Sequence, residues 1–545
     1  MSLPTTITKT AAARLWNLAE IGLIFLLFFL FAGWPAPDVN EAHYLAKAKH
    51  YWNPSWCPGD AFLGSADAHL VFDWTFGWLT LLFPLPVVAW LGRCLTWGLL
   101  AWSWRRLSFA VVPERLVAVL SAALCLLFNE HCQMAGEWVV GGVEAKGFAY
   151  VCVFLALESL LRQRWSAVWI WIGLASAFHV LVGGWSAVAV GCAWLSCRQL
   201  RPPLARLAPA MLCGLLLALL GLLPALALTR GVSADLACEA NEIYVYGRLS
   251  HHLVFWLFPH YRLARQALLL AVWLAACFAT PCQVCRGRLG QRPLRGFVGG
   301  AVAIALAGIV IDQSLRDYSD LAAALLRYYW FRLNDVMLPV GAALALVALV
   351  RSWQNSRPKL AGWATAVAIG AVGTSLIMGN LERRNDLRPG ADRQGLPTWD
   401  DDARMTRQAY VAWCRVCWWI SEHTESEARC ITPRSQQTFK WRAGRSEVCS
   451  WKDMPQDAGA LVDWWQREQE VYPRLVLAGG LAAHGEQRLL ELAEKYGARY
   501  IVLDRYLSQR PLLLRRVYPD QFDDPQAFYE VYQVPHPASQ RRRSS

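Results

Sequence analysis

The stretch WNLAEIGLIFLLFFLFAGWPAPDVNEAHYL, residues 16–45, decides the fold. Its first part, 16–36, is apolar and long enough to cross a bilayer, which takes about 20 residues in a helix. The chain then turns polar and carries two carboxylates, Asp38 and Glu41, three residues apart. A membrane helix that opens directly into an acidic segment predicts a membrane protein with ionisable groups at the lipid boundary.

The rest of the 545-residue chain continues this pattern. Apolar residues make up 55% of it and charged residues 17%, whereas soluble domains hold about 45–50% and 25%. We therefore expect an all-α polytopic membrane domain over residues 1–379, with about eleven transmembrane helices. The short pair around Gly183–Gly184 could instead form a re-entrant hairpin. The candidate spans are 16–36, 86–104, 116–133, 148–161, 166–180, 183–197, 207–228, 266–280, 296–311, 336–350 and 360–379.

The loops between these segments fall into two alternating sets of different charge. One set holds 17 Lys and Arg residues against a single acid, Glu114. By the positive-inside rule this set and the N-terminus are cytosolic, and the C-terminal part lies outside a cell (inner) membrane. The net charge of +12 is then a topology signal and requires no nucleic-acid partner. The predicted outward loops are 37–85, 130–147, 229–265 and 312–335.

The last part of the chain differs in kind. After a linker at 380–402, rich in Gly, Pro and Asp, residues 403–545 are charged and nearly neutral. Apolar residues that recur every three or four positions predict helices, and short runs of β-branched or aromatic residues predict strands. We therefore expect a small extracytoplasmic α/β domain. Its four cysteines favour one or two disulfides in an oxidising compartment: Cys414, Cys417, Cys430 and Cys449. The predicted helices are 403–423, 457–470 and 484–496, and the strands end at Ile431 or span 499–503 and 528–534.

The first group of ionisable residues is the segment PDVNEAHYL (37–45). If it opens a helix, Asp38 and Glu41 share one face at the membrane rim. Such a pair can perform acid–base chemistry. The same spacing also suits a helix cap, with Asp38 as N-cap and Glu41 as its partner. The spacing leaves both interpretations open.

A second group lies between residues 130 and 150, where the chain re-enters lipid. Glu137, Glu144 and Lys146 interrupt an apolar sequence there, and charges at that depth must be paired or face a wet cavity. A structural Glu144–Lys146 ion pair and a functional placement are both compatible with the sequence.

A third group combines RLSHH (248–252) with RYYWFRLND (327–335). Arginine forks grip phosphate, whereas the aromatic residues also suit anchoring at the membrane interface. The adjacent histidines lack the H-x₃-H or HExxH spacing of a zinc site, so we expect no metal site there. No P-loop or GxGxxG motif is present, which argues against a nucleotide site. The candidate residues are Arg248, His251, His252, Arg332 and Asp335.

The order of these features resembles the GT-C glycosyltransferases, which use polyprenyl-phosphate-linked sugars. The segment PDVNEAHYL is similar to the acidic motif that follows the first helix in that family. GGVEAKGFAY (141–150) and RLSHHL (248–253) depart from the characterised branches and are more similar to an uncharacterised bacterial multi-pass branch.

The resemblance implies sugar transfer from a polyprenyl-phosphate donor to an unidentified acceptor on the outer face. Membrane lipid is then a partner, and the resemblance allows a divalent metal but requires no cofactor. Asp38 is the best match to the catalytic base and Glu41 the second, with Glu41 or Glu144 orienting the acceptor. The implied substrate-binding residues are Lys146, Arg248 and Arg332 for phosphate, with His251, His252 and Asp335 beside them.

Two other functions remain open at this point. A cavity lined by the acids and bases of the outward loops could carry a solute, as in a multi-pass transporter. Transporters are often built from repeated halves, which this sequence lacks. Alternatively, the C-terminal domain could bind a partner in a non-catalytic membrane receptor or scaffold.

Overall fold

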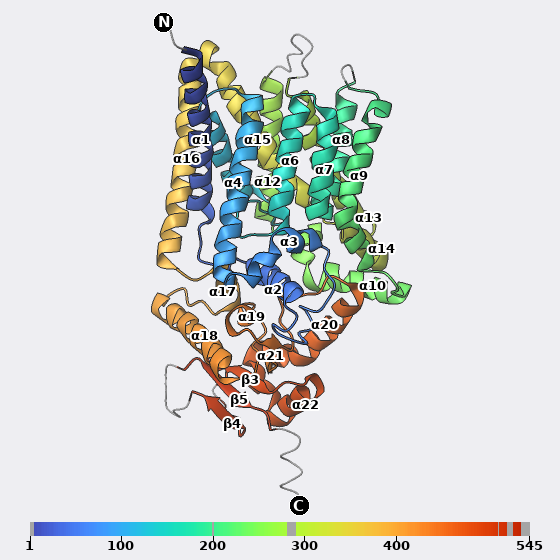
Figure 1. The fold of residues 1–545 in the computed structure, drawn as a ribbon, viewed down its shortest axis with the longest axis vertical. Coiled ribbons are helices and arrows are strands. Elements are labelled where there is room, and N and C mark those ends of the chain that lie inside the picture. The colour runs from blue at the N-terminus through green and yellow to red at the C-terminus, as the bar shows by residue number, and fades with distance from the viewer. Residues whose placement is uncertain are drawn as a thin grey trace, which may run out of the picture.

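The fold is described by a computed structural model over residues 5–198, 201–280, 290–508, 510, 512–519 and 527–535. It consists of a long helical body followed by a small α/β region. Figure 1 shows the α/β region packed against one end of the body.

A helix lies at each of the eleven ranges predicted to span the membrane. Seven of these helices are long and apolar enough to cross a bilayer, so the chain is a multi-pass membrane protein by length and composition. Four shorter helices complete the set: α5 (Val117–Cys132), α6 (Ala145–Leu161), α7 (Trp165–Phe178) and α8 (Val180–Ser196). The seven longer helices are α1 (Thr5–Ala32), α4 (Leu85–Val111), α9 (Leu204–Ala227), α12 (His260–Ala279), α13 (Arg292–Ser314), α15 (Arg332–Ser356) and α16 (Pro358–Asn385).

The two sets of loops lie at opposite ends of the helical body. The connections that follow α1, α5, α9 and α13 face the α/β region, and the described residues of the basic connections lie at the opposite end, where α1 begins (Figure 1). The charge asymmetry of the sequence therefore corresponds to two physical faces of the molecule.

Helices α7, α8 and α9 pack closely through glycines. A Cβ atom on Gly173 would overlap the backbone of Gly214, and one on Gly183 would overlap Ser176. The turn between α7 and α8 falls at His179, whose extended backbone separates the two helices. The break between the predicted spans 166–180 and 183–197 therefore lies a few residues earlier than expected, and Gly183 and Gly184 lie inside α8, where Gly183 allows close packing.

Short helices fill the space between the helical body and the α/β region. We call this space the junction. Helices α2 and α3 come from the segment after α1; α2 packs against α19, and α3 lies between α2 and the ends of the membrane helices (Figure 1). The short junction helices are α2 (Glu41–Trp52), α3 (Leu70–Thr75), α10 (Ala234–Glu242), α11 (Ser250–Leu253), α14 (Ser319–Leu326) and α17 (Gly390–Gly395).

The C-terminal α/β region contains a five-stranded sheet in the order β2-β1-β3-β5-β4. Strand β1 (Arg429–Ile431) pairs in parallel with β2 (Ser446–Glu447) and β3 (Tyr500–Asp504). Strand β5 (Tyr529–Gln533) runs antiparallel to β3 and to β4 (Arg515–Tyr518). The predicted helices are confirmed as α18 (Ala403–His423), α20 (Ala458–Val471) and α22 (Glu486–Tyr496). Strands β2 and β4 and helices α19 (Phe439–Ala443) and α21 (Arg474–Gly479) had not been predicted.

The four cysteines of this region are free thiols, so the expected disulfides are not formed. Cys417 and Cys430 are packed in one apolar core, and Cys449 lies in a second core on the other side of the sheet. Buried thiols of this kind behave as small apolar groups. The segment expected to be a linker is also well packed, since Asp392 in α17 is buried against Arg442.

Candidate functional site

Asp38 lies where α1 ends and the chain enters the junction. Its Oδ1 accepts a hydrogen bond from the amide of Val39 (2.8 Å), and its Oδ2 accepts one from the amide of Gly142 (2.9 Å). Gly390 and Gly142 leave room for it, because a Cβ atom at either position would crowd the Asp38 side chain. Among the described residues, no Lys, Arg or His forms an ion pair with Asp38. The carboxylate is thus oriented by backbone amides, partly exposed, and not neutralised by a cation.

Glu41, in contrast, is fully buried and engaged through both oxygens. Arg93 of α4 donates to Oε1 (2.6 Å) and to Oε2 (2.5 Å), and the amide of Val143 also donates to Oε1 (2.8 Å). The amide of Asp38 donates to Oε2 (2.7 Å), which is half of the predicted capping-box arrangement. Helix α2 begins at Glu41 itself, with Asn40 as its N-cap, so Asp38 does not cap it. Glu41 therefore ties the first loop to α4.

A chain of buried charges runs from Glu144 towards α7 and α15. Lys146 lies 3.4 Å from Oε2 of Glu144 and 3.7 Å from Oε1 of Glu137. Arg332 pairs with Oε2 of Glu137 (3.2 Å) and donates to Nε2 of His179 (3.0 Å). The predicted Glu144–Lys146 ion pair is present, but as one step of this longer chain.

Glu144 is the member of the chain next to Asp38. Its Oε1 accepts a hydrogen bond from the amide side chain of Asn40 (3.0 Å), and the two carboxylates interact electrostatically. Burial raises the pKa of Glu144, with Lys146 acting in the opposite direction. Lys146 and Asn40 thus hold the Glu144 carboxylate against the cost of its burial.

Asp335 supports the site from the first turn of α15. Its carboxylate accepts hydrogen bonds from the amides of Met134 (2.9 Å) and Ala135 (2.7 Å), and it is completely buried. His252 contacts the carbonyl of Ala135 through Nδ1, and burial lowers the pKa of His252 to about 3. Both residues thus fix the loop that precedes Glu137.

The third group and the C-terminal region together supply basic side chains to the junction. Arg248 donates to the carbonyl of Trp451 (3.0 Å) and stacks on its ring. Lys452 lies close enough to Arg248 and Glu144 to interact electrostatically with both. Burial, helped by Arg248, lowers the pKa of Lys452 to about 8. Within the described ranges neither residue has a carboxylate within ion-pair distance; we call Arg248 and Lys452 the basic pair.

Asp453, next in sequence to Lys452, connects the C-terminal region to α2. Its Oδ1 lies 3.2 Å from Nδ1 of His43, and its Oδ2 lies 2.5 Å from Nζ of Lys440. Burial alone would raise the pKa of Asp453, but Lys440 and His43 hold it well below its usual range. Burial lowers the pKa of His43.

The structure thus gathers most of the predicted site residues at the junction. Glu144 contacts Lys146 and the side chain of Asn40, two residues after Asp38, and Arg332 joins Lys146 through Glu137. His251 is exposed at the edge, its ring tilted against that of His252, and it joins none of these contacts. Glu41 and Asp335 are present but fully occupied by other protein groups.

Sequence reasoning missed Lys452, Asp453, His43 and His179. His43 stands inside the PDVNEAHYL motif, and a lone histidine in the apolar run around 179 was a detectable signal. Lys452 and Asp453 lie in a charged domain of ordinary composition, where nothing local marks them. Among the described residues, no group of three or more His, Cys, Asp or Glu side chains is arranged to hold a metal ion.

One protein-family model matches part of the chain. Residues 411–471, which extend from α18 to α20, match the family described as "Domain of unknown function (DUF6798)". None of the curated proteins matches the sequence.

Two solved structures are similar to the chain in arrangement. One is the archaeal oligosaccharyltransferase AglB from Archaeoglobus fulgidus in complex with an inhibitory peptide and a dolichol-phosphate. It is 13% identical, with a TM-score of 0.47, and the match covers 90% of this chain and 70% of that one. The other is the Archaeoglobus fulgidus oligosaccharyltransferase in complex with Zn and sulfate, at 12% identity and a TM-score of 0.45, covering 90% and 68%.

At these identities, and with TM-scores below 0.5, the likeness assigns neither a catalytic residue nor a substrate to this chain.

Proposed function

We propose that this chain is a membrane glycosyltransferase that transfers a sugar from a polyprenyl-phosphate donor to an acceptor at the junction. One observation carries the proposal. The basic pair, Arg248 and Lys452, lacks carboxylate partners among the described residues and lies in the same charged neighbourhood as Asp38 and Glu144. Phosphate departure requires cations that are not already neutralised, and proton removal requires a carboxylate without a cationic partner, such as Asp38.

The donor phosphate would bind the basic pair. The guanidinium of Arg248 is half-buried and uses Nε for the carbonyl of Trp451, which leaves its two terminal nitrogens for a phosphate. Lys452 adds a second positive charge that stabilises the negative charge developing on the leaving phosphate. The junction lies at the end of the membrane helices, so a polyprenyl chain could remain in lipid while its phosphate reaches these residues.

Asp38 would act as the general base. Its oxygens are oriented by two amides and retain lone pairs for an acceptor hydroxyl. As the hydroxyl oxygen forms a bond to the anomeric carbon, its proton passes to Asp38. The carbon–oxygen bond to phosphate breaks, and the electron pair leaves with the phosphate.

The remaining charged residues would position these groups. Glu144, held by Asn40 and Lys146, lies beside Asp38 and orients the acceptor. Lys146 and Arg332 are neutralised by Glu137 and Glu144, so we assign them to the shape and field of the site more than to direct phosphate contact. None of these steps requires a metal ion.

The proposed sidedness places the junction outside the cell membrane, with eleven spans and a cytosolic N-terminus. It is supported by the basic loops at the opposite end of the helical body. A transporter or a receptor would need no such combination of unpaired cations and an oriented base.

The test is sugar release from polyprenyl-phosphate-hexose donors by the full chain in nanodiscs. Asp38→Asn should lower turnover by at least about 100-fold, the usual contribution of a general base, with donor binding retained. Arg248→Ala should weaken donor binding by roughly 10–100-fold, since a charge-assisted hydrogen bond contributes about 1.5–3 kcal/mol. Exposed Arg474→Gln on α21 is the matched control and should change neither quantity.

Full turnover in Asp38→Asn would remove Asp38 as the base. Unchanged donor binding in Arg248→Ala would remove the phosphate role of the basic pair. If the wild-type chain releases no sugar from any polyprenyl-phosphate donor, the proposed function itself fails.

A further inference from the structure

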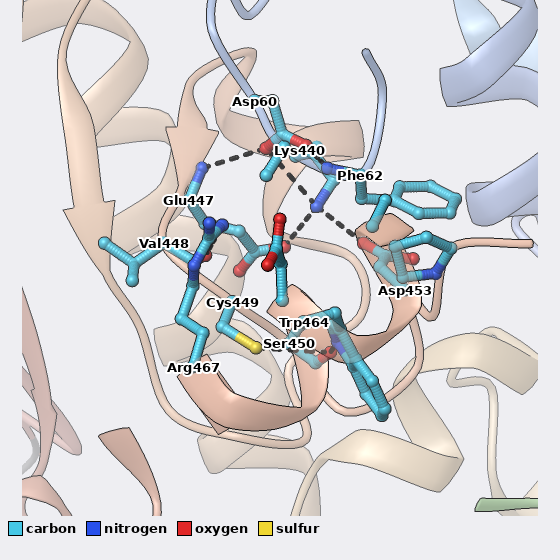
Figure 2. A pocket seen from close by; sticks show the side chains of 14 residues that line it. Asp60, Phe62, Lys440, Glu447, Val448, Cys449, Ser450, Asp453, Trp464 and Arg467 are labelled. Carbon is cyan, nitrogen blue, oxygen red and sulfur yellow. Dashed lines mark hydrogen bonds and ion pairs between the residues drawn. The ribbon is translucent and has the colours of Figure 1, made fainter. Parts of the chain in front are cut away.

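A cavity lies between the C-terminal region and the loop that precedes α3. It has a volume of about 150 Å³ and is shown in Figure 2. Helix α20 contributes Ala460, Asp463, Trp464 and Arg467, which recur at the spacing of one helix face. The loop before α3 closes the other side with Asp60 and Phe62.

At the top of the cavity a single ammonium meets three carboxylates. Lys440 lies 2.6 Å from Glu447, 2.5 Å from Asp453 and 3.6 Å from Asp60 (Figure 2). Burial alone would lower the pKa of Lys440, but the three carboxylates raise it well above its usual value. Lys440 is therefore committed to these acids and is not available for an anionic ligand.

Lower in the cavity, polar groups are left without protein partners. The Oγ of Ser450 and the Nε of Arg467 have no hydrogen-bond partner among the described residues, although both atoms are buried. Ser450 is only 2% exposed. Arg467 donates to the carbonyl of Val448 (3.2 Å), and in Figure 2 it lies across the cavity from Trp464. Buried polar groups normally have partners, so these two indicate a polar ligand.

We propose that this cavity binds a hydroxyl-rich sugar unit of the acceptor. The inference rests on the proposed function, of which it names the acceptor class. Ser450 and Arg467 would donate to hydroxyl oxygens, and Asp463 at the exposed rim would accept from hydroxyl groups. Trp464 and Phe62 provide apolar surface for the carbon face of a sugar ring.

The size and charge of the cavity agree with this ligand. A space of this volume holds roughly ten water-sized groups, close to the number of non-hydrogen atoms in a hexose. Four carboxylates and two basic side chains line it, so it favours neutral or basic ligands and disfavours a phosphate. The donor phosphate and this ligand therefore bind at different places.

The neighbouring residues Lys452 and Asp453 show how the two places relate. Lys452 belongs to the basic pair of the phosphate site, whereas Asp453 lines the cavity and contacts Lys440. Because Lys452 and Asp453 are consecutive residues, the cavity and the proposed phosphate site are neighbours. We therefore assign the cavity to the acceptor, which must reach the donor, and not to the lipid.

The test uses methyl glucoside, methyl mannoside and methyl galactoside as probes, with saturation-transfer-difference NMR on the full chain in nanodiscs. At least one glycoside should bind, and Arg467→Gln should weaken its binding at least tenfold. Ser450→Ala, which removes only the hydroxyl, should weaken it severalfold. Arg474→Gln on the surface is the control for the loss of a positive charge, and thermal unfolding should show that all variants remain folded.

A methyl glucuronide should bind at least tenfold more weakly than methyl glucoside, because its carboxylate enters an acidic cavity. Asp463→Asn should reduce that difference. The inference is overturned if no glycoside gives a signal or if Arg467→Gln and Ser450→Ala bind as well as wild type. Donor-site variants such as Arg248→Ala should leave glycoside binding unchanged, so a failure of sugar transfer and a failure of sugar binding are told apart.

Discussion

At the scale of single residues, the two acids of the first loop have separate roles. Glu41 and Arg93 form a buried ion pair with no exposed atoms, whereas Asp38 remains partly open. We predict that Glu41→Gln destabilises the fold by about 3–5 kcal/mol, because it leaves the charge of Arg93 buried and unpaired. Thermal unfolding in nanodiscs measures this loss.

The double variant Glu41→Gln with Arg93→Leu removes the unpaired charge and should regain part of the stability. Asp38→Asn should unfold close to the wild-type temperature. If Glu41→Gln is as stable as wild type, the carboxylate is not the structural partner that its contacts indicate.

Lys452 predicts a pH dependence that can be measured directly. Burial and Arg248 lower its pKa to about 8, so its positive charge is lost as the pH rises from 7 to 9. Donor affinity should fall over that range, since the deprotonated amine no longer attracts phosphate. Lys452→Arg keeps its charge and should bind donor equally at pH 7 and 9. A wild-type affinity that is constant over this interval would contradict the assignment.

At the scale of elements, the sequence predicted helices better than the contacts between them. The length of an apolar run is enough to locate a membrane helix, because a backbone in lipid must satisfy its own hydrogen bonds. It does not reveal how closely two helices approach. The adjacent pair Gly183 and Gly184 shows this, because a Cβ atom on Gly183 would overlap Ser176 whereas one on Gly184 meets nothing within 4 Å.

Alanine at these two neighbouring positions should therefore have opposite outcomes. Gly183→Ala should cost about 1–3 kcal/mol, because α7 and α8 must move apart or distort. Gly184→Ala should be neutral or slightly stabilising, since alanine is the better helix former. Chemical or thermal unfolding of the two variants side by side gives the comparison. Equal losses would mean that the α7–α8 contact is looser than described.

At the scale of the whole molecule, the site residues that the sequence predicts lie close to one another in the chain. The residues that it misses contact partners far away in the chain. The acidic motif after α1 and the Glu144–Lys146 pair are local, so spacing and hydropathy identified them. The contact between His43 and Asp453 joins residues 410 positions apart, and no local pattern links them. Lys440, Lys452 and Asp453 stand in a soluble-like domain, where charged residues are ordinary. Their importance arises only when that domain closes over the junction.

Lys440 is the residue through which this closure can be tested. It holds Glu447 and Asp453 of its own domain together with Asp60 of the loop between α2 and α3. Lys440→Met removes the ammonium and leaves three carboxylates facing one another in a buried space. Since breaking a buried ion pair costs about 3–5 kcal/mol, the domain should open far more often, and limited proteolysis at the junction should accelerate at least tenfold.

Lys495→Met is the matched control, because its ammonium is exposed and pairs only at the surface. It should leave the proteolysis rate unchanged. The same opening should separate Lys452 from Glu144, so Lys440→Met should lose sugar transfer although Lys440 touches neither Asp38 nor the basic pair. Retained transfer together with accelerated proteolysis would show that the helical body alone carries the chemistry, and the C-terminal domain would then be only a cover.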